Sequence, residues 1–358
     1  MLRNIYKSLA LFIIFLIAGV FHSQTQAQQS GTMTGLFCSN YIMPDKMKDS
    51  DKLIKKVAEI LKKKDKQGYK AIEFVSDFVQ KHCHKKADFY LRYINDSFYE
   101  NLDNALPTIV HETYHAYTDI YGLIHKGKVV KSPEGVEVGS GAEIWIRSPF
   151  KGYAFYFTDS GHHVVEITQT YPAKELVSQI TGELRTMRFE PYIDPSSSGG
   201  LGSTQTYGVY GLLDEFHAYY HDFITGLHVM DKYALDTFNA HGPPFYEFKY
   251  YILKYLMYAQ KKHRKIYKGI MKNKDFKKVF LLIHDKFAAL VEPHIEEERA
   301  LFLKELEGSH SYSFNGTVYK PENFGKAFEK SSGFKDIHIL KKELEKPEYQ
   351  KMMELLRK

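Results

Sequence analysis

The sequence has few cysteines, little imbalance of charge and no long apolar run beyond its N-terminus. Its 2 cysteines among 358 residues exclude a small scaffold that disulfides hold together. Lys and Arg (49) only slightly outnumber Asp and Glu (43), so the composition indicates no nucleic-acid partner, which would need a basic face. With 44% hydrophobic and 26% charged residues, the chain has the composition of a globular protein with a sizeable core, which excludes disordered and collagen-like classes.

The N-terminal apolar run predicts a signal peptide rather than a membrane anchor. Arg3 and Lys7 precede an unbroken apolar run of 13 residues at 9–21, and the small residues Thr25 and Ala27 suit a cleavage site. The run is shorter than the roughly 20 residues that a spanning helix needs. We therefore expect the segment up to Ala27 (1–27) to be removed from a secreted, periplasmic or cell-envelope protein, with no stable membrane insertion after cleavage.

Export would place Cys38 and Cys83 in an oxidising compartment, where a disulfide is permitted. A bridge between them would stabilise the fold by about 4 kcal/mol in the chain-entropy treatment of the unfolded state. Two unrelated buried thiols are the alternative, because the sequence does not establish that the side chains meet.

Hydrophobic periodicity predicts a predominantly helical α+β fold. Apolar residues recur at helical spacing in 51–66 and 71–82, and a long helix at 101–121 is expected to stop at Gly122. An alternating, aromatic-rich run predicts a strand at 88–94 before that helix. The further predicted strands, which form a small antiparallel sheet, are 143–147, 153–158 and 164–168. The further predicted helices are 176–187, 209–227, 245–270, 276–306 and a charged C-terminal helix that ends at Lys358.

Composition divides the remainder of the chain into three parts. Residues 28–126 end in the long helix, residues 127–206 form a β-rich insert, and residues 207–358 form a helical part. The insert closes with a Ser/Gly-rich loop at 194–206, which is a candidate lid or boundary.

The long predicted helix carries the string His111-Glu112-Thr113-Tyr114-His115. Residues four apart lie on one face of a helix, so His111 and His115 can bind one metal ion through two ring nitrogens. Glu112 lies one position round the helix, where a general base for a metal-activated water belongs. The pattern predicts one Zn²⁺ per chain, and two surface histidines on an amphipathic helix are the alternative.

A catalytic zinc ion needs a third protein ligand and an open position. A metzincin would have Gly at position 118 and His at position 121, where this chain has Thr118 and Tyr121. An aspzincin would use an Asp, but Asp119 lies two helical turns beyond His111, about 12 Å along the axis, so one ion cannot bind both. Asp119 is better placed to accept a hydrogen bond from the outer nitrogen of His115.

The remaining arrangement takes a Glu from a later helix. Glu215 fits it because the small residues Gly211 and Ala218 flank it and would let two helices approach closely. HExxH followed by E-x-x-A on a later helix resembles the gluzincin metallopeptidases, and the string HETYHAYTD at 111–119 is similar to the active-site helix of thermolysin-like enzymes. The resemblance implies that Glu215 joins the two histidines as a zinc ligand.

This resemblance covers about 20 residues and departs from the family in two respects. About 100 residues separate His115 from Glu215, a longer interval than is typical of gluzincins, and Tyr219 stands where the family has Asp. Three residues on the adjacent helix face are alternative ligands: Asp214, His217 and His221.

Peptide hydrolysis also needs a donor for the negative charge that develops in the transition state. His217 and His221 are predicted catalytic residues in this role because they follow Glu215 on the same helix. The other candidates are Tyr207, Tyr210, Arg185 and Arg188.

Together these patterns predict an exported zinc-dependent peptidase with a peptide or protein substrate and no nucleic-acid partner. Glu112 is the predicted general base, and the strand at 88–94 is expected to hold an extended substrate by edge pairing. The alternative is a non-catalytic helical envelope or extracellular binding protein in which the HExxH string is structural or accidental. The oligomeric state does not follow from the sequence.

Overall fold

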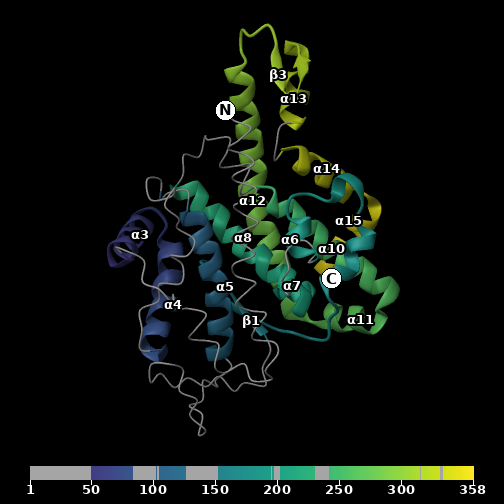
Figure 1. Cartoon of the computed structure of the whole chain (residues 1–358). Coiled ribbons are helices and arrows are strands. Elements are labelled where there is room, and N and C mark those ends of the chain that lie inside the picture. The colour runs from purple at the N-terminus through teal and green to yellow at the C-terminus, as the bar shows by residue number, and fades with distance from the viewer. Residues whose placement is uncertain are drawn as a thin grey trace.

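The structure is a computed structural model of the chain, and the residues it describes are 50–83, 102, 105–125, 152–194, 196, 202–229, 242–314, 316–330 and 334–358. Helices make up most of these residues and two short antiparallel strand pairs accompany them (Figure 1), so the predicted fold class is confirmed. The predictions that lie outside the described residues concern the signal peptide at 1–27, the strands at 88–94 and 143–147, Cys38 and the side chain of Cys83.

Three helices begin the described part of the chain: α3 (Ser50–Lys64), α4 (Lys66–Cys83) and α5 (Leu106–His125). The first two confirm the amphipathic predictions, because apolar positions of both helices enter one core together with α5. However, α5 continues through Gly122 rather than stopping there. A glycine inside a helix costs only about 1 kcal/mol, and it ends a helix where the chain turns into a left-handed conformation.

The predicted helix at 209–227 is α8 (Val209–Val229), which lies at the centre of the molecule. It packs along α5 and against the C-terminal helices, so almost all of its side chains are buried. Its Gly211 approaches the one-turn helix α7 (Ser203–Thr206), where an added Cβ atom would lie 2.4 Å from the carbonyl oxygen of Ser203. This small residue therefore permits the close contact between α8 and α7, a role that the sequence did not predict.

Two of the predicted strands form an antiparallel pair, β1 (Gly152–Phe157) and β2 (Gly161–Glu166). Gly161, with a φ of 72°, lets the chain turn tightly between them. Strand β1 lies against α5 and also touches α8, while β2 lies against α12 (Lys274–Glu305). The strand pair therefore covers the helix that carries the HExxH string.

The prediction of a helix at 176–187 is wrong. The chain forms two short 3₁₀ turns there, Ala173–Gln179 and Gly182–Leu184, followed by the short helix α6 (Phe189–Tyr192). Gly182 has a φ of 58°, which lies in the left-handed region that a right-handed helix cannot contain.

The helix predicted at 245–270 is divided in two at His263. Its parts are α10 (Pro244–Lys262) and α11 (Arg264–Lys272), and the φ of −125° and ψ of 56° at His263 interrupt the helical backbone between them. Apolar spacing does not reveal the break because the pattern resumes one residue later.

Helix α12 confirms the prediction at 276–306, and Asn273 caps its start by accepting a hydrogen bond from the amide of Phe276. Its far end extends away from the body and leads into the strand pair β3 (Tyr312–Phe314) and β4 (Thr317–Tyr319) (Figure 1), which the sequence patterns do not predict. The last elements are the 3₁₀ turn Pro321–Asn323, α13 (Phe324–Lys330), α14 (Phe334–Leu344) and α15 (Pro347–Arg357).

Two groups of buried apolar side chains form the core. The smaller lies among α3, α4 and α5, and the larger lies among the β1–β2 pair and the helices from α6 onward. Figure 1 shows these two parts side by side, and they meet where α5 packs along α8. Within the described ranges, no helix is both long and apolar enough to span a membrane.

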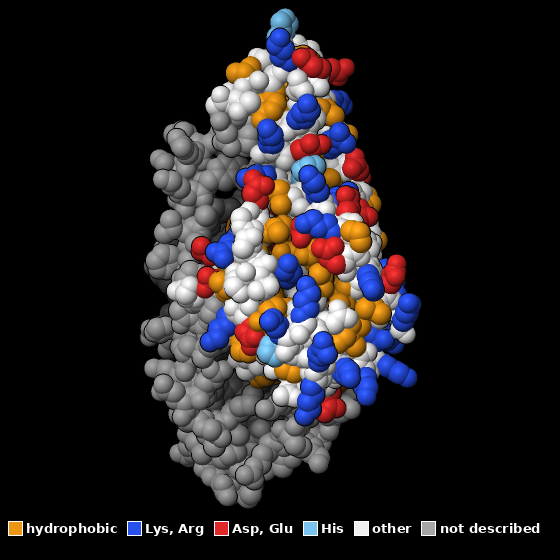
Figure 2. Space-filling view, turned by 90° about the vertical axis from the view of Figure 1, so that its right-hand side faces the viewer, with side chains coloured by type: hydrophobic (Ala, Val, Ile, Leu, Met, Phe, Trp, Pro, Cys, Tyr) orange, Lys and Arg blue, Asp and Glu red, His pale blue; other side chains and the backbone are white. Residues whose placement is uncertain are grey.

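Charge is distributed less evenly over the surface than the composition indicates. Figure 2 shows acidic and basic side chains interspersed over the upper part of one face and mainly basic side chains at its lower end. Residues 261–278, which include α11, contain nine Lys or Arg and one acidic residue, Asp275. The chain therefore contains one strongly basic segment, although its net charge is small.

Candidate metal centre

The two histidines of the HExxH string meet on one face of α5. His111 and His115 are one helical turn apart, and their Nε2 atoms lie 3.1 Å from each other with the rings at 81°. The preceding Ile109 and Val110 are fully buried, which fixes the rotation of α5 and hence the direction of both imidazoles. The helix thus brings the two histidine side chains together, as their four-residue spacing predicts.

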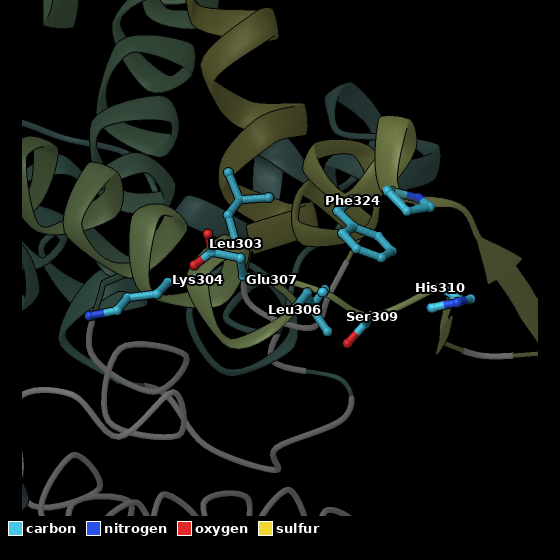
Figure 3. A pocket seen from close by; sticks show the side chains of 9 residues that line it. Leu303, Lys304, Leu306, Glu307, Ser309, His310 and Phe324 are labelled. Carbon is cyan, nitrogen blue, oxygen red and sulfur yellow. The ribbon is translucent and has the colours of Figure 1, made fainter.

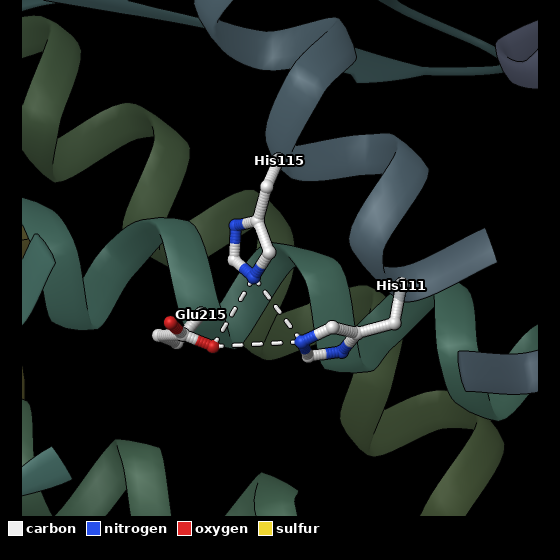
Figure 4. Close-up of side chains that lie close together, drawn as sticks. All are labelled: His111, His115 and Glu215. Atoms are coloured by element: carbon white, nitrogen blue, oxygen red, sulfur yellow. Dashed lines mark hydrogen bonds and ion pairs between the residues drawn. The ribbon is translucent and has the colours of Figure 1, made fainter. Parts of the chain in front are cut away.

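Glu215 of α8 reaches the same point from the neighbouring helix. Its Oε2 atom lies 3.6 Å from His111 Nε2 and 3.3 Å from His115 Nε2, so the three side chains form a closed triangle (Figure 4). Within the described residues, this is the only group of three or more His, Cys, Asp or Glu side chains that could hold a metal ion. We call it the His-His-Glu group.

The dimensions of the His-His-Glu group suit a small metal ion. Ligand atoms bound to a tetrahedral zinc ion lie about 3.3 Å from one another, and the edges of this triangle are 3.1, 3.3 and 3.6 Å. Glu215 Oε2 is buried and accepts no hydrogen bond, although it faces the two ring nitrogens. Two imidazole nitrogens and one carboxylate oxygen are the donor set of many catalytic zinc sites, so these residues fit the ion.

Electrostatics keep the carboxylate of this group ionised. Burial favours the neutral form of Glu215, but the positive charge of His115 and the close polar contacts of both histidines outweigh it and lower the pKa of Glu215 to about 2. Burial likewise opposes the charge on His115, yet the neighbouring carboxylates of Asp214 and Glu215 hold the pKa of His115 well above its ordinary value. A metal ion bound by these three residues would therefore have one negatively charged ligand, Glu215.

Asp214 orients the second histidine. Its Oδ2 atom lies 2.6 Å from His115 Nδ1, and Asp214 is itself buried. An Nδ1 proton donated to this carboxylate leaves the lone pair of Nε2 directed at Glu215 and His111, as a metal ligand requires. The prediction gave this role to Asp119, whose side chain lies outside the described residues, and the carboxylate that the structure provides comes from α8 instead.

Glu112 directly follows His111 in α5. Its side chain is partly exposed and, among the described residues, has no hydrogen-bond or ion-pair partner. The side chain of His115 is 23% exposed, whereas His111 is buried. Of the two histidines, His115 is therefore the one that solvent reaches.

A polar network packs against His111. The ring of Tyr219 packs edge-on against His111, with ring centroids 4.3 Å apart, and its hydroxyl lies 3.0 Å from that of Tyr192. Arg188 stands over the ring of Tyr219 and donates to Glu247 across 2.8 Å. Burial raises the pKa of Tyr219, although the charge of Arg188 opposes that shift. Tyr219, where gluzincins have Asp, thus contacts His111 through its ring.

His217 and His221 do not join the His-His-Glu group. A helix turns about 200° over two residues, so His217 leaves α8 on nearly the opposite side from Glu215. Both rings are buried and contact the main-chain oxygen of Tyr156 in β1, at 3.0 Å for His217 and 3.3 Å for His221. The prediction that they line the site with Glu215 is therefore wrong, because the rotation of α8 directs them towards β1.

The other predicted donors also have partners. Tyr210 shares a hydrogen bond of 2.7 Å with Thr168, and Tyr207 packs against the ring of Tyr153. Arg185 donates to main-chain oxygens near the 3₁₀ turns. Of these candidates only Arg188, through Tyr219, is linked to the His-His-Glu group.

One described cavity lies away from this group. It has a volume of about 790 Å³ and lies at the far end of α12 (Figure 3), where its lining includes Leu303, His310 and Phe324. None of its lining residues belongs to the His-His-Glu group. This cavity is therefore separate from the candidate site.

Two features of this site do not follow from the sequence analysis. It predicts Asp214 only as an alternative ligand, although a carboxylate directly before the ligand Glu is a signal for its contact with His115. The contact of Tyr219 with His111 carries no local signal, because it depends on how α8 is rotated against α5.

Comparison of the chain with protein-family models, curated proteins and solved structures finds no match. Function therefore has to be inferred from the site itself.

Proposed function

We propose that this chain is an exported zinc-dependent peptidase of gluzincin type, which hydrolyses peptide bonds in a peptide or protein substrate. The observation that carries the proposal is the convergence of His111 Nε2, His115 Nε2 and Glu215 Oε2 from two helices, with Glu112 free beside them. Each of these residues supplies the chemistry that its position in an HExxH-plus-Glu site requires.

Three side chains would hold the ion. His111 and His115 contribute neutral ring nitrogens and Glu215 contributes a charged oxygen, which leaves a fourth position open. A zinc ion bound there lowers the pKa of a water molecule and polarises the carbonyl group of a peptide. Asp214 keeps His115 in the tautomer that binds metal.

Glu112 moves the proton. Its carboxylate lies next to His111 in the helix and is engaged by no other described side chain, so it is free to accept a proton from the attacking water. The same carboxylate then delivers the proton to the amine that leaves, which completes cleavage of the C–N bond without net change in the enzyme.

Tyr219 and Arg188 position His111. The Arg188–Glu247 ion pair is buried and holds the guanidinium over the ring of Tyr219, whose edge contacts His111. His217 and His221 face Tyr156 instead, so we do not assign them the predicted role of stabilising the charge of the transition state.

The test compares the wild-type chain with Glu112→Gln and with Glu305→Gln, a matched control on the exposed surface of α12. Zinc content is measured by mass spectrometry, and hydrolysis is followed with a fluorogenic casein or peptide library. Glu112→Gln is expected to keep its zinc and to lose at least about 10²-fold in kcat/KM, because it loses the base and keeps the ligands. Glu305→Gln should resemble the wild type.

Two outcomes would overturn the proposal. If the His111→Gln and His115→Gln variants had the same zinc content as the wild type, the His-His-Glu group would not be the zinc site. A protein that binds zinc there but cleaves no peptide, with Glu112→Gln indistinguishable from the wild type, is a metal-stabilised binding protein rather than an enzyme.

A further inference from the structure

A second pair of histidines on α8 repeats the geometry of the first. His217 and His221 are one helical turn apart, and their Nε2 atoms lie 3.1 Å from each other with the rings at 83°. The corresponding values for His111 and His115 are 3.1 Å and 81°. Both pairs therefore direct two ring nitrogens at one point.

A third donor completes the second pair. The main-chain oxygen of Tyr156 lies 3.0 Å from His217 Nε2 and 3.3 Å from His221 Nε2. The resulting triangle has edges close to the 3.3 Å or so expected between ligands of a tetrahedral zinc ion. It differs from the His-His-Glu group in that a carbonyl oxygen of β1 replaces the carboxylate.

We propose that His217, His221 and the main-chain oxygen of Tyr156 form a second binding site for a divalent transition-metal ion, with Zn²⁺ as the simplest occupant. The inference is independent of peptidase activity. It requires only that two imidazoles and a carbonyl oxygen share one ion, a donor set that zinc and its neighbours accept.

The surroundings of the pair favour the form that binds metal. The side chains of His217 and His221 are buried, and burial disfavours a charged imidazole. A neutral imidazole has one nitrogen with a free lone pair, which is the form that ligates metal.

The side chain next to His221 can adapt to a bound ion. Gln67 Nε2 lies 3.1 Å from His221 Nδ1, and Gln67 Oε1 accepts a hydrogen bond from Thr158. When His221 Nε2 binds a metal its proton resides on Nδ1, and a half-turn of the Gln67 amide then presents Oε1 as the acceptor. After that rotation Gln67 would correspond to Asp214 in the first group, since each would accept from the second histidine of its pair.

The site would stabilise the contact between β1 and the helices. His221 is stacked face to face on Tyr114 of the HExxH string, with ring centroids 3.5 Å apart, while Tyr156 belongs to β1. An ion held by both histidines and the strand would thus tie α8 and β1 together next to α5. We expect the ion to raise thermal stability rather than to take part in the reaction.

The experiment counts metal ions on the full chain. The protein is stripped with a chelator, titrated with Zn²⁺ alone, and examined with ¹¹³Cd²⁺ by NMR. We expect two equivalents of Zn²⁺ per chain and two ¹¹³Cd resonances. His111→Gln combined with His115→Gln and Glu215→Gln should retain one equivalent, and its melting temperature should still rise when Zn²⁺ is added. His217→Gln combined with His221→Gln should also retain one equivalent, whereas the buried control His284→Gln should bind two.

The opposite result is equally specific. In the absence of metal, two ring N–H groups can donate to the single oxygen of Tyr156 and hold the strand by hydrogen bonds alone. One equivalent of Zn²⁺ and one ¹¹³Cd resonance in the wild type, with that equivalent lost in His111→Gln, would overturn the second site. The NMR measurement needs no variant, so misfolding of a substituted chain does not affect it. Failure of the peptidase proposal would instead leave two bound ions and no hydrolysis.

Discussion

His115 Nδ1 lies 2.6 Å from Asp214 Oδ2, so the residue directly before Glu215 orients the histidine that Glu215 faces. Consecutive residues of α8 thus serve the same imidazole, one at each ring nitrogen. A helix separates consecutive side chains by about 100°, and His115 inserts its ring edge between them. Neither carboxylate could do both tasks, because the two nitrogens point in different directions.

Asp214→Asn is expected to weaken zinc binding by about 10–100-fold while leaving the fold intact. The amide keeps the shape of the side chain but accepts the Nδ1 proton less strongly than a carboxylate, so it holds the ligating tautomer of His115 less firmly. Isothermal titration of the stripped protein with Zn²⁺ measures the change, with the exposed Asp275→Asn as control. Unchanged affinity would mean that Asp214 does not orient the ligand.

Glu215→Gln is expected to weaken zinc binding more than Asp214→Asn does, by over about 100-fold, because it removes the negative ligand itself. Glu112→Gln is the matched control, since it neutralises a carboxylate next to the group without removing a ligand. The same titration applies. If Glu215→Gln bound zinc as tightly as the wild type, the third ligand would have to be sought elsewhere on α8.

Arg188→Met is expected to lower the free energy of unfolding by about 3–5 kcal/mol, because it leaves the charge of Glu247 buried without its partner. Both side chains are buried, and the Arg188 amide also donates to Glu247 Oε1. Urea unfolding measures the loss. Arg357→Met, which breaks an exposed pair with Asp285, should cost less than about 1 kcal/mol. Equal costs for the two substitutions would contradict a structural role for the buried pair.

Gly211→Ala is expected to destabilise the protein by about 2 kcal/mol or more, since its Cβ atom would lie 2.4 Å from the backbone of Ser203 and force α7 away. Gly269→Ala is the matched control within α11, where the nearest atom to the added Cβ, Thr168 Oγ1, is 3.9 Å away. There the substitution should stabilise by about 0.5–1 kcal/mol through helix propensity. Thermal denaturation shows whether each substitution raises or lowers the stability of the protein. A Gly211→Ala variant as stable as the wild type would contradict the close contact between α7 and α8.

His284 is expected to make the fold sensitive to acid. Burial, helped by the charge of Lys249, lowers the pKa of His284 to about 4, although Asp285 opposes the shift. In the unfolded chain the pKa of this ring is 6.5, so between pH 6.5 and pH 4 the unfolded chain binds a proton that the folded chain does not bind. The contribution of His284 is therefore complete above pH 6.5 and declines as the pH falls towards 4, by up to about 3 kcal/mol.

His284→Gln should remove that part of the pH dependence. Urea unfolding at pH 7 and pH 4.5 gives the difference for each protein, and the wild type should lose more stability than the variant between the two. Parallel losses in both proteins would show that His284 is not the group that titrates.

The local parts of the fold followed from the sequence because they depend on neighbours along the chain. Periodicity predicted α3, α4, α8 and α12, and the four-residue spacing placed His111 and His115 on one face of α5. Predictions failed where one residue changed the backbone, as at Gly182 and His263, since apolar spacing does not report φ and ψ.

The partners of those residues were decided by tertiary structure. The sequence by itself determined that two imidazoles share a helix face, that Glu112 lies beside them and that Glu215 could reach them. Only the packing of α8 along α5 decided that Asp214 meets His115 and that His217 turns away to Tyr156. These contacts join residues far apart in sequence, and they depend on the rotation and offset of one packed helix against another, which the whole core determines rather than any local pattern.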